Sequence, residues 1–292
     1  MRRLAVLPLL LALAACGERA VTPRAGETTT PPPATSTPST PPPVTHSYAA
    51  DAVVLRVRKA GGLAPPDRVR DLPLWTLYGD GRVTTMGAVP AIYPGPAIDP
   101  VMVARVTPAQ MDALTNAARA AGVDGQRRDY GEPPVADAQS TVFELSDEQG
   151  TAKLSVYALD EGFSYDGYTA EQLANRRRIL EFLRGTLQSE QWRGPEQPKD
   201  EPYVPAAVAV YARPWAAREG DPGPPQDLAW KGPDPSKGET KNAGTCTVVT
   251  GDALAAVLPD LRRANARTRW TYAGKTYALV LRPLLPDEHG CL

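Results

Sequence analysis

Residues 21–45 contain eight prolines and eight threonines, and this stretch limits most strongly how the chain can fold. Proline fixes the backbone angle φ and has no N–H group, so the stretch cannot continue a helix or a sheet ladder. Its only large apolar side chains are two valines, which cannot build a core. We therefore expect an extended spacer of polyproline II character, and a folded body that begins after residue 46.

The rest of the chain has the composition of a folded protein. Of the 292 residues, 42% are hydrophobic and 22% are charged, which suits a globular body with a sizeable core. The formal net charge is -1. Because there is no excess of positive charge and no basic stretch with interleaved aromatic residues, we do not expect nucleic acid as a partner.

Residues 47–188 are predicted to form a first module. Residues 51–60 are β-branched and alternate in character in their second part, which is typical of a strand. Residues 72–85 predict two strands joined at an Asp-Gly pair, which tight hairpin turns favour because glycine tolerates positive φ. Residues 140–159 predict another hairpin, which turns near a Gln-Gly pair.

Two helices are expected in this module, and each begins with a capping box. Thr107 and Gln110 are separated by the required three positions, as are Thr169 and Gln172. The apolar positions expected to face the core are Met111, Leu114, Ala118 and Ala121 in the first helix and Leu173, Ile179, Leu180, Leu183 and Leu187 in the second. Three consecutive arginines, 176–178, are expected to point largely toward water.

Residues 203–292 are predicted to form a second module with the same order of elements. Residues 204–214 predict a strand, and residues 245–265 predict a strand followed by a helix. Residues 268–285 predict a hairpin. The polar and proline-rich residues 189–203 form the expected boundary between the modules.

The predicted fold class is α+β. It consists of two similar β-β-α-β-β modules in which helices pack on one face of antiparallel sheets. The modules resemble each other in pattern more than in identity, and the alternative is that both belong to one compact body.

The start of the chain follows the order of an export signal. Two arginines after the first methionine form a basic region, and an apolar run of about eleven residues follows, too short to span a bilayer as a helix. The run ends in Leu13-Ala14-Ala15-Cys16. This sequence resembles the lipobox of bacterial lipoproteins. The composition of the chain, rich in Ala, Pro and Arg, resembles that of envelope lipoproteins of actinobacterial type.

The resemblance implies that residues 1–15 are a signal peptide and that the thiol of Cys16 receives a diacylglyceryl group. Residues 16–46 are then the lipidated cysteine and its spacer, which can hold the body up to about 75 Å from the lipid. Two acyl chains give durable anchoring, whereas one binds only marginally. The implied location is the extracytoplasmic face of the cell membrane, reached through diacylglyceryl-Cys16. The alternative is an ordinary secretory signal with an incidental cysteine.

The other two cysteines lie in the last fifty residues. If lipid occupies Cys16, then Cys246 and Cys291 remain as an even pair in an oxidising compartment, and we expect a disulfide between them. The alternative is two free thiols, or a nucleophilic Cys291 with His289 as its base.

The sequence contains no motif of a common catalytic or metal site. Its two histidines are His46, at the end of the spacer, and His289, and neither accompanies a serine motif of the G-x-S-x-G kind. Zinc motifs such as C-x-x-C and H-E-x-x-H do not occur, nor do phosphate-binding or dinucleotide-binding glycine motifs. The sequence therefore predicts no catalytic residue, no metal site and no cofactor.

Acidic and aromatic side chains are the remaining candidates. The acidic ones are Asp129, Glu132 and Asp137 in one stretch and Asp160, Glu161 and Asp166 in another. Paired carboxylates can hydrolyse glycosidic bonds or bind calcium, but acidic residues beside glycine and proline are also ordinary loop residues. The aromatic ones are Trp75, Trp230, Trp270, Tyr272 and Tyr277, for which packing in a core is the alternative to a binding surface.

These observations together favour a lipid-anchored lipoprotein whose body is a non-enzymatic binding, scaffolding or accessory module at the cell envelope. Its expected partner is an envelope protein or a cell-wall polymer. The alternative is a carboxylate-dependent hydrolase of cell-wall glycan or of an exported polymer. An enzyme predicts carboxylates that converge in a pocket with raised pKa values, whereas a binding module predicts an exposed apolar patch.

Overall fold

The computed structural model describes residues 47–63, 66–161, 165–189, 192–194, 199–217, 220 and 223–292. Contacts divide the chain into Met1–Pro43 and Val44–Leu292, and every described residue belongs to the second unit. The expected signal peptide, Cys16, the whole expected spacer and His46 lie outside the described residues. The account below concerns the second unit, which we call the body.

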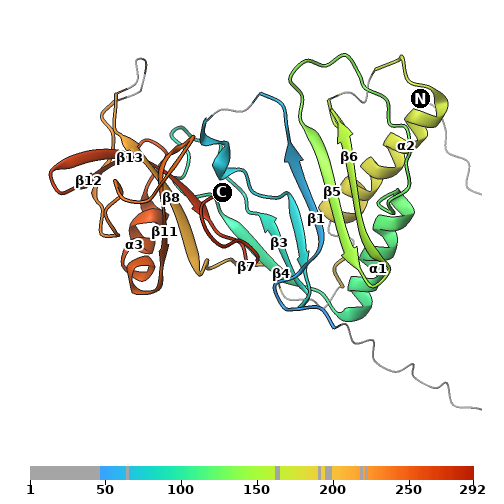
Figure 1. Ribbon diagram of the computed structural model, residues 1–292, viewed down its shortest axis with the longest axis horizontal. Coiled ribbons are helices and arrows are strands. Elements are labelled where there is room, and N and C mark those ends of the chain that lie inside the picture. The colour runs from blue at the N-terminus through green and yellow to red at the C-terminus, as the bar shows by residue number, and fades with distance from the viewer. Residues whose placement is uncertain are drawn as a thin grey trace, which may run out of the picture. The chain divides into compact units, whose positions relative to one another are not determined.

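The body contains a mixed α and β structure with two mostly antiparallel sheets (Figure 1). The first sheet has seven strands in the order β6-β5-β1-β2-β3-β4-β7, and all neighbouring strands are antiparallel. The strands are β1 (Val53–Ala60), β2 (Trp75–Tyr78), β3 (Arg82–Met86), β4 (Val101–Arg105), β5 (Ser140–Asp147), β6 (Gly150–Tyr157) and β7 (Glu201–Pro202). A short 3₁₀ helix, η1 (Pro66–Arg70), precedes β2.

The turns that the sequence predicted for this sheet are confirmed. Asp80 and Gly81 lie between β2 and β3, and Gly81 has a φ of 81°, which an L side chain rarely adopts. Gly150 begins β6 directly after the turn from β5. The strand predicted at residues 51–60 is β1, which lies in the middle of the sheet between β5 and β2.

Both capping boxes form. In α1 (Pro108–Ala121), the Gln110 N–H donates to Thr107 Oγ1 at 3.3 Å and the Thr107 N–H donates to Gln110 Oε1 at 2.8 Å. In α2 (Ala170–Glu181), Thr169 and Gln172 exchange the same two bonds at 3.2 and 2.8 Å. These bonds satisfy N–H groups that have no partner within the first helical turn. A π-helical segment, η2 (Phe182–Gln188), continues α2.

The first core lies between this sheet and helices α1 and α2. Eight of the nine predicted core positions in these helices are buried, and Leu173 is half-buried. The sheet and the helices contribute, among others, Leu55, Val57, Trp75, Leu77, Phe143, Met111, Leu114, Ala118, Ile179 and Leu183. The apolar residues that alternate along the strands pack here against the apolar residues that recur on one face of each helix, and together they form one apolar layer.

The predicted exposure of all three arginines in α2 is wrong for Arg176. Its side chain is 0% exposed, whereas Arg177 and Arg178 are exposed. Arg176 donates to the carbonyl oxygens of Tyr130 at 3.1 Å, Tyr157 at 3.1 Å and Ala158. The guanidinium group therefore satisfies backbone carbonyl groups of a loop and of the end of β6. The helical pattern of the sequence gives no sign of these distant acceptors.

The second sheet has six strands in the order β10-β11-β8-β13-β12-β9. Neighbouring strands are antiparallel except β12 and β9, which are parallel. The strands are β8 (Ala207–Pro214), β9 (Asp227–Ala229), β10 (Glu239–Lys241), β11 (Gly244–Thr250), β12 (Arg269–Tyr272) and β13 (Lys275–Pro283). Helix α3 (Gly251–Arg263) follows β11 directly and packs on this sheet through Leu254, Val257 and Leu261.

The expected layout of two similar modules is not confirmed, because the two sheets differ in strand order. In the first sheet, the strand that begins the hairpin, β5, pairs with the central strand β1. In the second sheet, the strand that ends the hairpin, β13, pairs with the central strand β8. The expected boundary, residues 189–203, contributes β7 to the edge of the first sheet.

The two sheets are connected by side chains near the end of the chain. Arg282 on β13 is 3% exposed, and it donates to the carbonyl oxygens of Val69, at 3.3 Å, and Asp71. Asp287 receives bonds from Arg56 at 2.6 Å and Tyr78 at 3.0 Å. Within the described ranges, no helix combines the length and the apolar character needed to cross a membrane.

Candidate functional site

The two acidic stretches share none of the best-formed hollows of the described surface. A cavity of about 550 Å³ beside β6 is lined by Asp129 and Glu132 from the first stretch, but by no acidic residue of the second. Five of the six acidic candidates are exposed, namely Asp129, Glu132, Asp137, Glu161 and Asp166. Asp160 is half-buried and pairs with Lys59 at 2.7 Å and Arg184 at 2.8 Å.

Asp129 and Asp160 have the electrostatics of hydrogen-bond acceptors rather than of proton donors. The Gly131 N–H and the Gln172 side chain donate to Asp129, at 2.8 and 2.9 Å, and lower its pKa. Burial opposes ionisation of Asp160, but the bonds and charges of Lys59 and Arg184 outweigh it and hold the pKa below its usual value. A general acid for glycoside hydrolysis needs a raised pKa instead, so this geometry does not favour the hydrolase.

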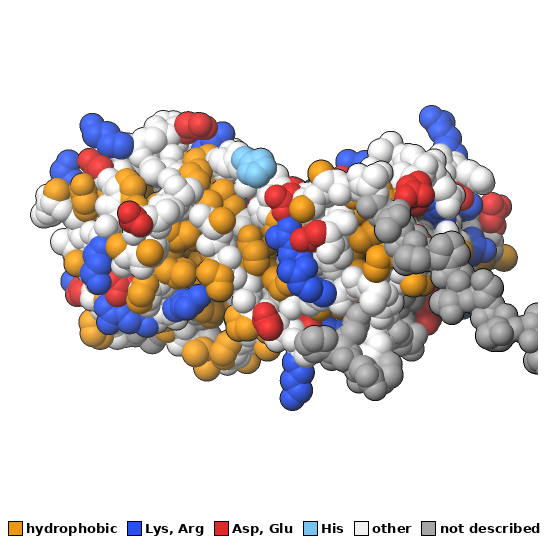
Figure 2. Space-filling view, turned by 90° about the horizontal axis from the view of Figure 1, so that it is seen from below, with side chains coloured by type: hydrophobic (Ala, Val, Ile, Leu, Met, Phe, Trp, Pro, Cys, Tyr) orange, Lys and Arg blue, Asp and Glu red, His pale blue; other side chains and the backbone are white. Residues whose placement is uncertain are grey.

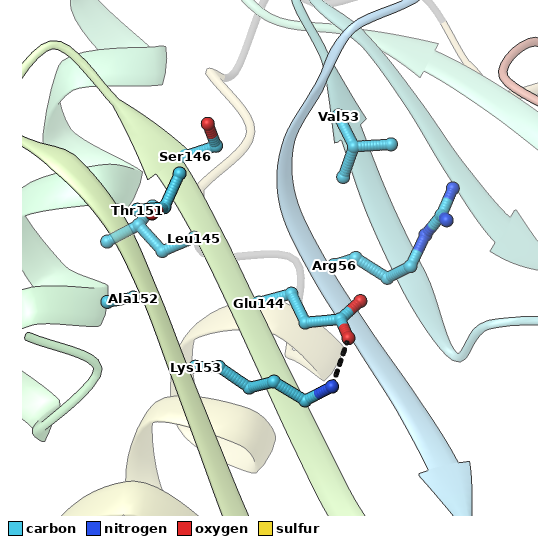
Figure 3. A pocket seen from close by; sticks show the side chains of 8 residues that line it. All are labelled: Val53, Arg56, Glu144, Leu145, Ser146, Thr151, Ala152 and Lys153. Carbon is cyan, nitrogen blue, oxygen red and sulfur yellow. Dashed lines mark ion pairs between the residues drawn. The ribbon is translucent and has the colours of Figure 1, made fainter. Parts of the chain in front are cut away.

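A second hollow, of about 520 Å³, lies on β1, β5 and β6 (Figure 3). Glu144 and Lys153 point toward each other across β5 and β6 at 3.1 Å, and Arg56 on β1 extends away from them. Glu144 also binds Arg58 at 3.2 Å. Burial opposes its ionisation, but these two cations keep the pKa of Glu144 lowered. The described lining holds this one carboxylate, so the hollow offers no acid pair.

A third hollow, of about 740 Å³, is rich in cations, but carboxylates already neutralise them. Its cationic side chains each form an ion pair with a carboxylate. The pairs are Arg56–Asp287, Arg58–Glu144, Lys59–Asp160, Arg68–Asp71, Arg70–Asp99 and Arg282–Glu288. An anionic ligand would have to displace a carboxylate from its partner, so we assign this hollow to the contact between the sheets and not to binding.

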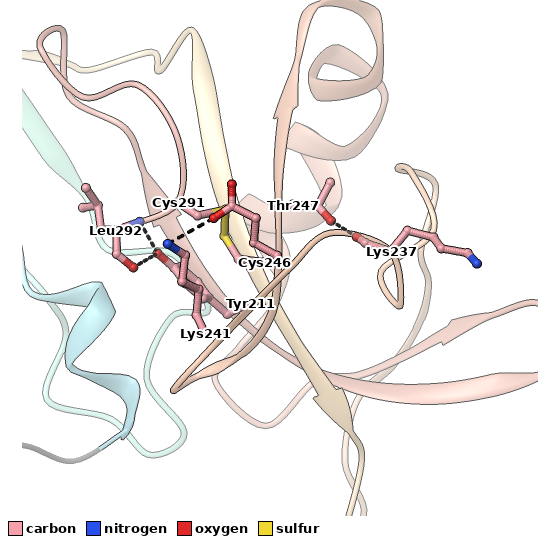
Figure 4. The surroundings of a disulfide bond; sticks show 8 residues. Tyr211, Lys237, Lys241, Cys246, Thr247, Cys291 and Leu292 are labelled. Carbon is pink, nitrogen blue, oxygen red and sulfur yellow. Dashed lines mark hydrogen bonds and ion pairs between the residues drawn. A yellow bond between two sulfur atoms is a disulfide. The ribbon is translucent and has the colours of Figure 1, made fainter.

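The pair of cysteines has a structural role. Cys246 on β11 and Cys291 form a disulfide with a Cα–Cα distance of 6.1 Å (Figure 4). The Leu292 N–H donates to the Tyr211 hydroxyl at 2.9 Å beside it. Because Cys291 Sγ is bonded, it is not the nucleophile of the alternative interpretation, and His289 is exposed. Among the described residues, no group of three or more His, Cys, Asp or Glu side chains is placed to hold a metal ion.

The aromatic candidates belong to the cores. Trp75, Trp230, Trp270 and Tyr277 are each less than a tenth exposed, and Tyr272 is half-buried. The rings of Trp230 and Trp270 meet edge to face with centroids 5.6 Å apart, and the Trp230 indole N–H donates to the Pro233 oxygen at 2.7 Å. Packing, and not a binding surface, explains these residues.

An exposed apolar segment lies between β3 and β4. Residues 88–93, with the sequence AVPAIY, are all exposed and all apolar, and we call them the apolar loop. The exposed fraction is 46% for Val89, 66% for Ile92 and 67% for Tyr93. Single exposed apolar residues are ordinary, but six in succession form a patch of the kind that marks contact surfaces.

The base of this loop is held by hydrogen bonds. The Gly87 N–H donates to the Pro100 oxygen at 2.9 Å and closes the loop. The Ala97 N–H donates to the Ala264 oxygen at 3.1 Å, and the Ala266 N–H donates to the Gly95 oxygen at 2.9 Å. These bonds, with Pro90 inside the loop, present the apolar side chains on a fixed support and lower the entropy lost on binding.

The segment that holds the base of the loop is basic. Residues 262–269 contain four arginines, and Asp260 is the only acidic residue between positions 260 and 269. Arg262 and Arg263 are exposed at the end of α3. On the face shown in Figure 2, hydrophobic side chains gather over the part of the body that contains the second sheet, with Lys and Arg side chains among them.

Comparisons with known proteins add no family to this description. No protein-family model matches the chain, and neither a curated protein nor a solved structure is significantly similar to it. The site therefore rests on its own geometry.

The apolar loop is the feature that the sequence analysis missed. Its signal is visible in the sequence, since residues 83–98 contain no charged side chain and include three prolines. A proline-rich and uncharged connection between two strands is not expected to be a buried strand, and it has fewer polar side chains than an ordinary surface loop. Only the exposure of the side chains, however, distinguishes a contact surface from a loop that folds back on the core.

Proposed function

We propose that this chain is a lipid-anchored, extracytoplasmic lipoprotein whose body is a non-enzymatic binding or accessory module at the cell envelope. The anchor rests on the lipobox-like Leu13-Ala14-Ala15-Cys16. The disulfide between Cys246 and Cys291 is in keeping with an oxidising compartment outside the cytoplasm. The observation that carries the binding function is the apolar loop, residues 88–93, on its hydrogen-bonded base.

The same proposal includes the division of the body into two related parts. In each part a strand leads directly into a helix, and a hairpin follows. Helix α1 of the first part corresponds to α3 of the second, and the β5–β6 hairpin corresponds to the β12–β13 hairpin. The structure supports the hydrolase less well, because Asp129 and Glu132 line a hollow without the second acidic stretch, and hydrogen bonds and neighbouring cations lower the pKa values of Asp129 and Asp160.

The anchor is tested by acyl-chain labelling in cells that produce the chain with Cys16 or with Cys16→Ser. We expect the labelled fatty acid on the unchanged chain and not on the variant. The variant should be held less firmly in the membrane fraction or persist as precursor, because a single apolar segment of eleven residues does not span a bilayer. Equal labelling of both chains would refute the anchor.

The binding function is tested by photo-crosslinking on intact cells. A photoreactive residue replaces Ile92 in the apolar loop or, as a matched control, Val204, which is 63% exposed and lies outside the loop. We expect adducts with an envelope component from position 92 and few from position 204. No adduct from position 92, or the same adducts from both positions, would argue against a contact function of this loop.

A further inference from the structure

We propose that the apolar loop is a second membrane contact, which enters the interface of an anionic lipid bilayer while Arg262, in the basic segment that holds its base, meets the headgroups. This inference rests on the proposed function, because it takes the anchored bilayer as the partner of the same loop. It names the partner as a lipid surface, which the lipobox alone does not imply. An anchor at Cys16 holds the spacer, whereas this contact would hold the body.

The side chains of the loop match the chemistry of a bilayer interface. Val89 and Ile92 are aliphatic, and Tyr93 combines an apolar ring with a hydroxyl group, a type that is enriched at the boundary between lipid and water. No charged residue stands between Arg82 and Asp99, so entry of the tip requires the removal of no charge from water. The loop is already formed, so its ordering does not oppose insertion.

The charge around the base of the loop favours anionic lipid over an apolar protein partner. The backbone bonds to Ala264 and Ala266 fix the loop beside a segment with four arginines. Arg263 pairs with Asp260 at 2.7 Å and Arg269 with Asp227 at 2.5 Å, so the attraction rests chiefly on the exposed Arg262. Arginines near a negatively charged leaflet are attracted to it, and the attraction decays within a Debye length. An apolar tip with a basic surround is the pattern of proteins that lie on a membrane surface.

The anchor makes a weak contact sufficient. Only residues 17–46 separate Cys16 from the first described residue, Ser47. The membrane is therefore always within reach of the body, at a high effective concentration. A loop of six residues need not bind a bilayer tightly by itself to keep an anchored body at its surface.

The contact is measured on the full chain carrying Cys16→Ser, which has no acyl chains of its own. The probe is a vesicle of phosphatidylcholine with phosphatidylglycerol, and the readout is co-flotation at high lipid concentration. We expect this chain to bind, and we expect the additional change Ile92→Asp to lower the partition coefficient at least about tenfold, because the transfer of one large aliphatic side chain is lost. The matched change Val204→Asp should leave partition unchanged.

The electrostatic part of the contact is tested separately. Vesicles of phosphatidylcholine alone should bind more weakly, and added salt should weaken binding to the anionic vesicles. Arg262→Gln should lower binding to anionic vesicles about fivefold and leave binding to neutral vesicles unchanged. Both Ile92→Asp and Arg262→Gln replace exposed side chains, and unchanged circular dichroism would establish that both variants are folded.

The outcomes separate this inference from the proposed function. Absence of vesicle binding by the Cys16→Ser chain, or equal binding by Ile92→Asp, would overturn the membrane contact. If position 92 crosslinks to a protein and not to lipid in cells, the binding function stands and the lipid surface is wrong. If acyl labelling of Cys16 fails while vesicles still bind the loop, the anchor is wrong and the membrane contact stands.

Discussion

Arg56 Nη2 lies 2.6 Å from Asp287 Oδ1, although 231 positions separate the two residues in the chain. The Tyr78 hydroxyl donates to the same oxygen at 3.0 Å. The side chains of Arg56 and Asp287 are 14% and 22% exposed, so solvent screens the pair less than a surface ion pair. The segment after β13 is thereby fixed to β1 and β2 of the first sheet.

This pair predicts a dependence of stability on acid. Burial opposes ionisation of Asp287, but Arg56 and Tyr78 outweigh it and hold its pKa below the usual value. Such a carboxylate contributes stability that is complete above its unfolded pKa of about 3.9 and is lost as pH falls through the folded pKa. We expect the free energy of unfolding, from urea titrations, to fall more steeply below about pH 4 in the unchanged protein than in Asp287→Asn. Parallel pH profiles would contradict this role.

Tyr203 predicts the opposite effect at alkaline pH. Burial raises the pKa of Tyr203 to about 12, and its hydroxyl donates to the Leu284 oxygen at 2.8 Å. A group with a raised folded pKa contributes stability that is complete below its unfolded pKa of about 10 and is lost as pH rises through the folded pKa. Stability should therefore fall between pH 10 and 12, and less steeply in Tyr203→Phe. Absorbance titration of the tyrosines checks the assignment.

Removal of the disulfide should destabilise the body. The bond joins residues 45 positions apart, for which the loop-closure model gives about 4 kcal/mol in the unfolded state. We expect the double variant Cys246→Ser/Cys291→Ser to lose most of this amount in chemical denaturation, and reductant to have the same effect on the unchanged protein. Cys16→Ser is the matched control and should leave the unfolding curve unaltered. A double variant as stable as the unchanged protein would show that the bond does not stabilise the fold.

Arg176 and Arg177 offer a matched test of burial. Arg176→Ala leaves the carbonyl oxygens of Tyr130, Tyr157 and Ala158 without their donor, and each buried carbonyl left unpaired costs about 1–3 kcal/mol. We expect a loss of at least about 3 kcal/mol in the free energy of unfolding. Arg177→Ala, at the exposed neighbouring position, should change it by less than about 0.5 kcal/mol. Similar losses in the two variants would contradict the structural role of Arg176.

Much of the local structure could be predicted from the sequence, because its causes are local. Thr107 and Gln110 lie within one helical turn, so their capping box needs no distant partner. The turn at Asp80-Gly81 depends on the freedom of a single glycine. Strand order could not be predicted in this way, because β1 pairs with β5 across about eighty intervening residues and apolar alternation does not name a partner.

The candidate site was predicted less well than the fold. Acidic and aromatic residues were chosen by their chemistry, but Asp160 proved to be neutralised by two cations and Trp270 is packed in a core. The apolar loop carries no reactive group, so a search for chemistry passes over it. The loop is a candidate because its apolar side chains are exposed, and exposure is known only from the packed molecule.

The sequence by itself determined the capped helices and the hairpin turns, and it contains the proline-rich stretch and the lipobox-like start on which the proposed anchor rests. Each of these follows from bond rotations, hydrogen bonds or short apolar periods within a few neighbouring residues. Only the tertiary structure decided the order of the strands, the burial of Arg176, the link between Arg56 and Asp287, and the exposure of residues 88–93. These depend on which distant surfaces exclude water from one another, and that is settled when the whole chain packs.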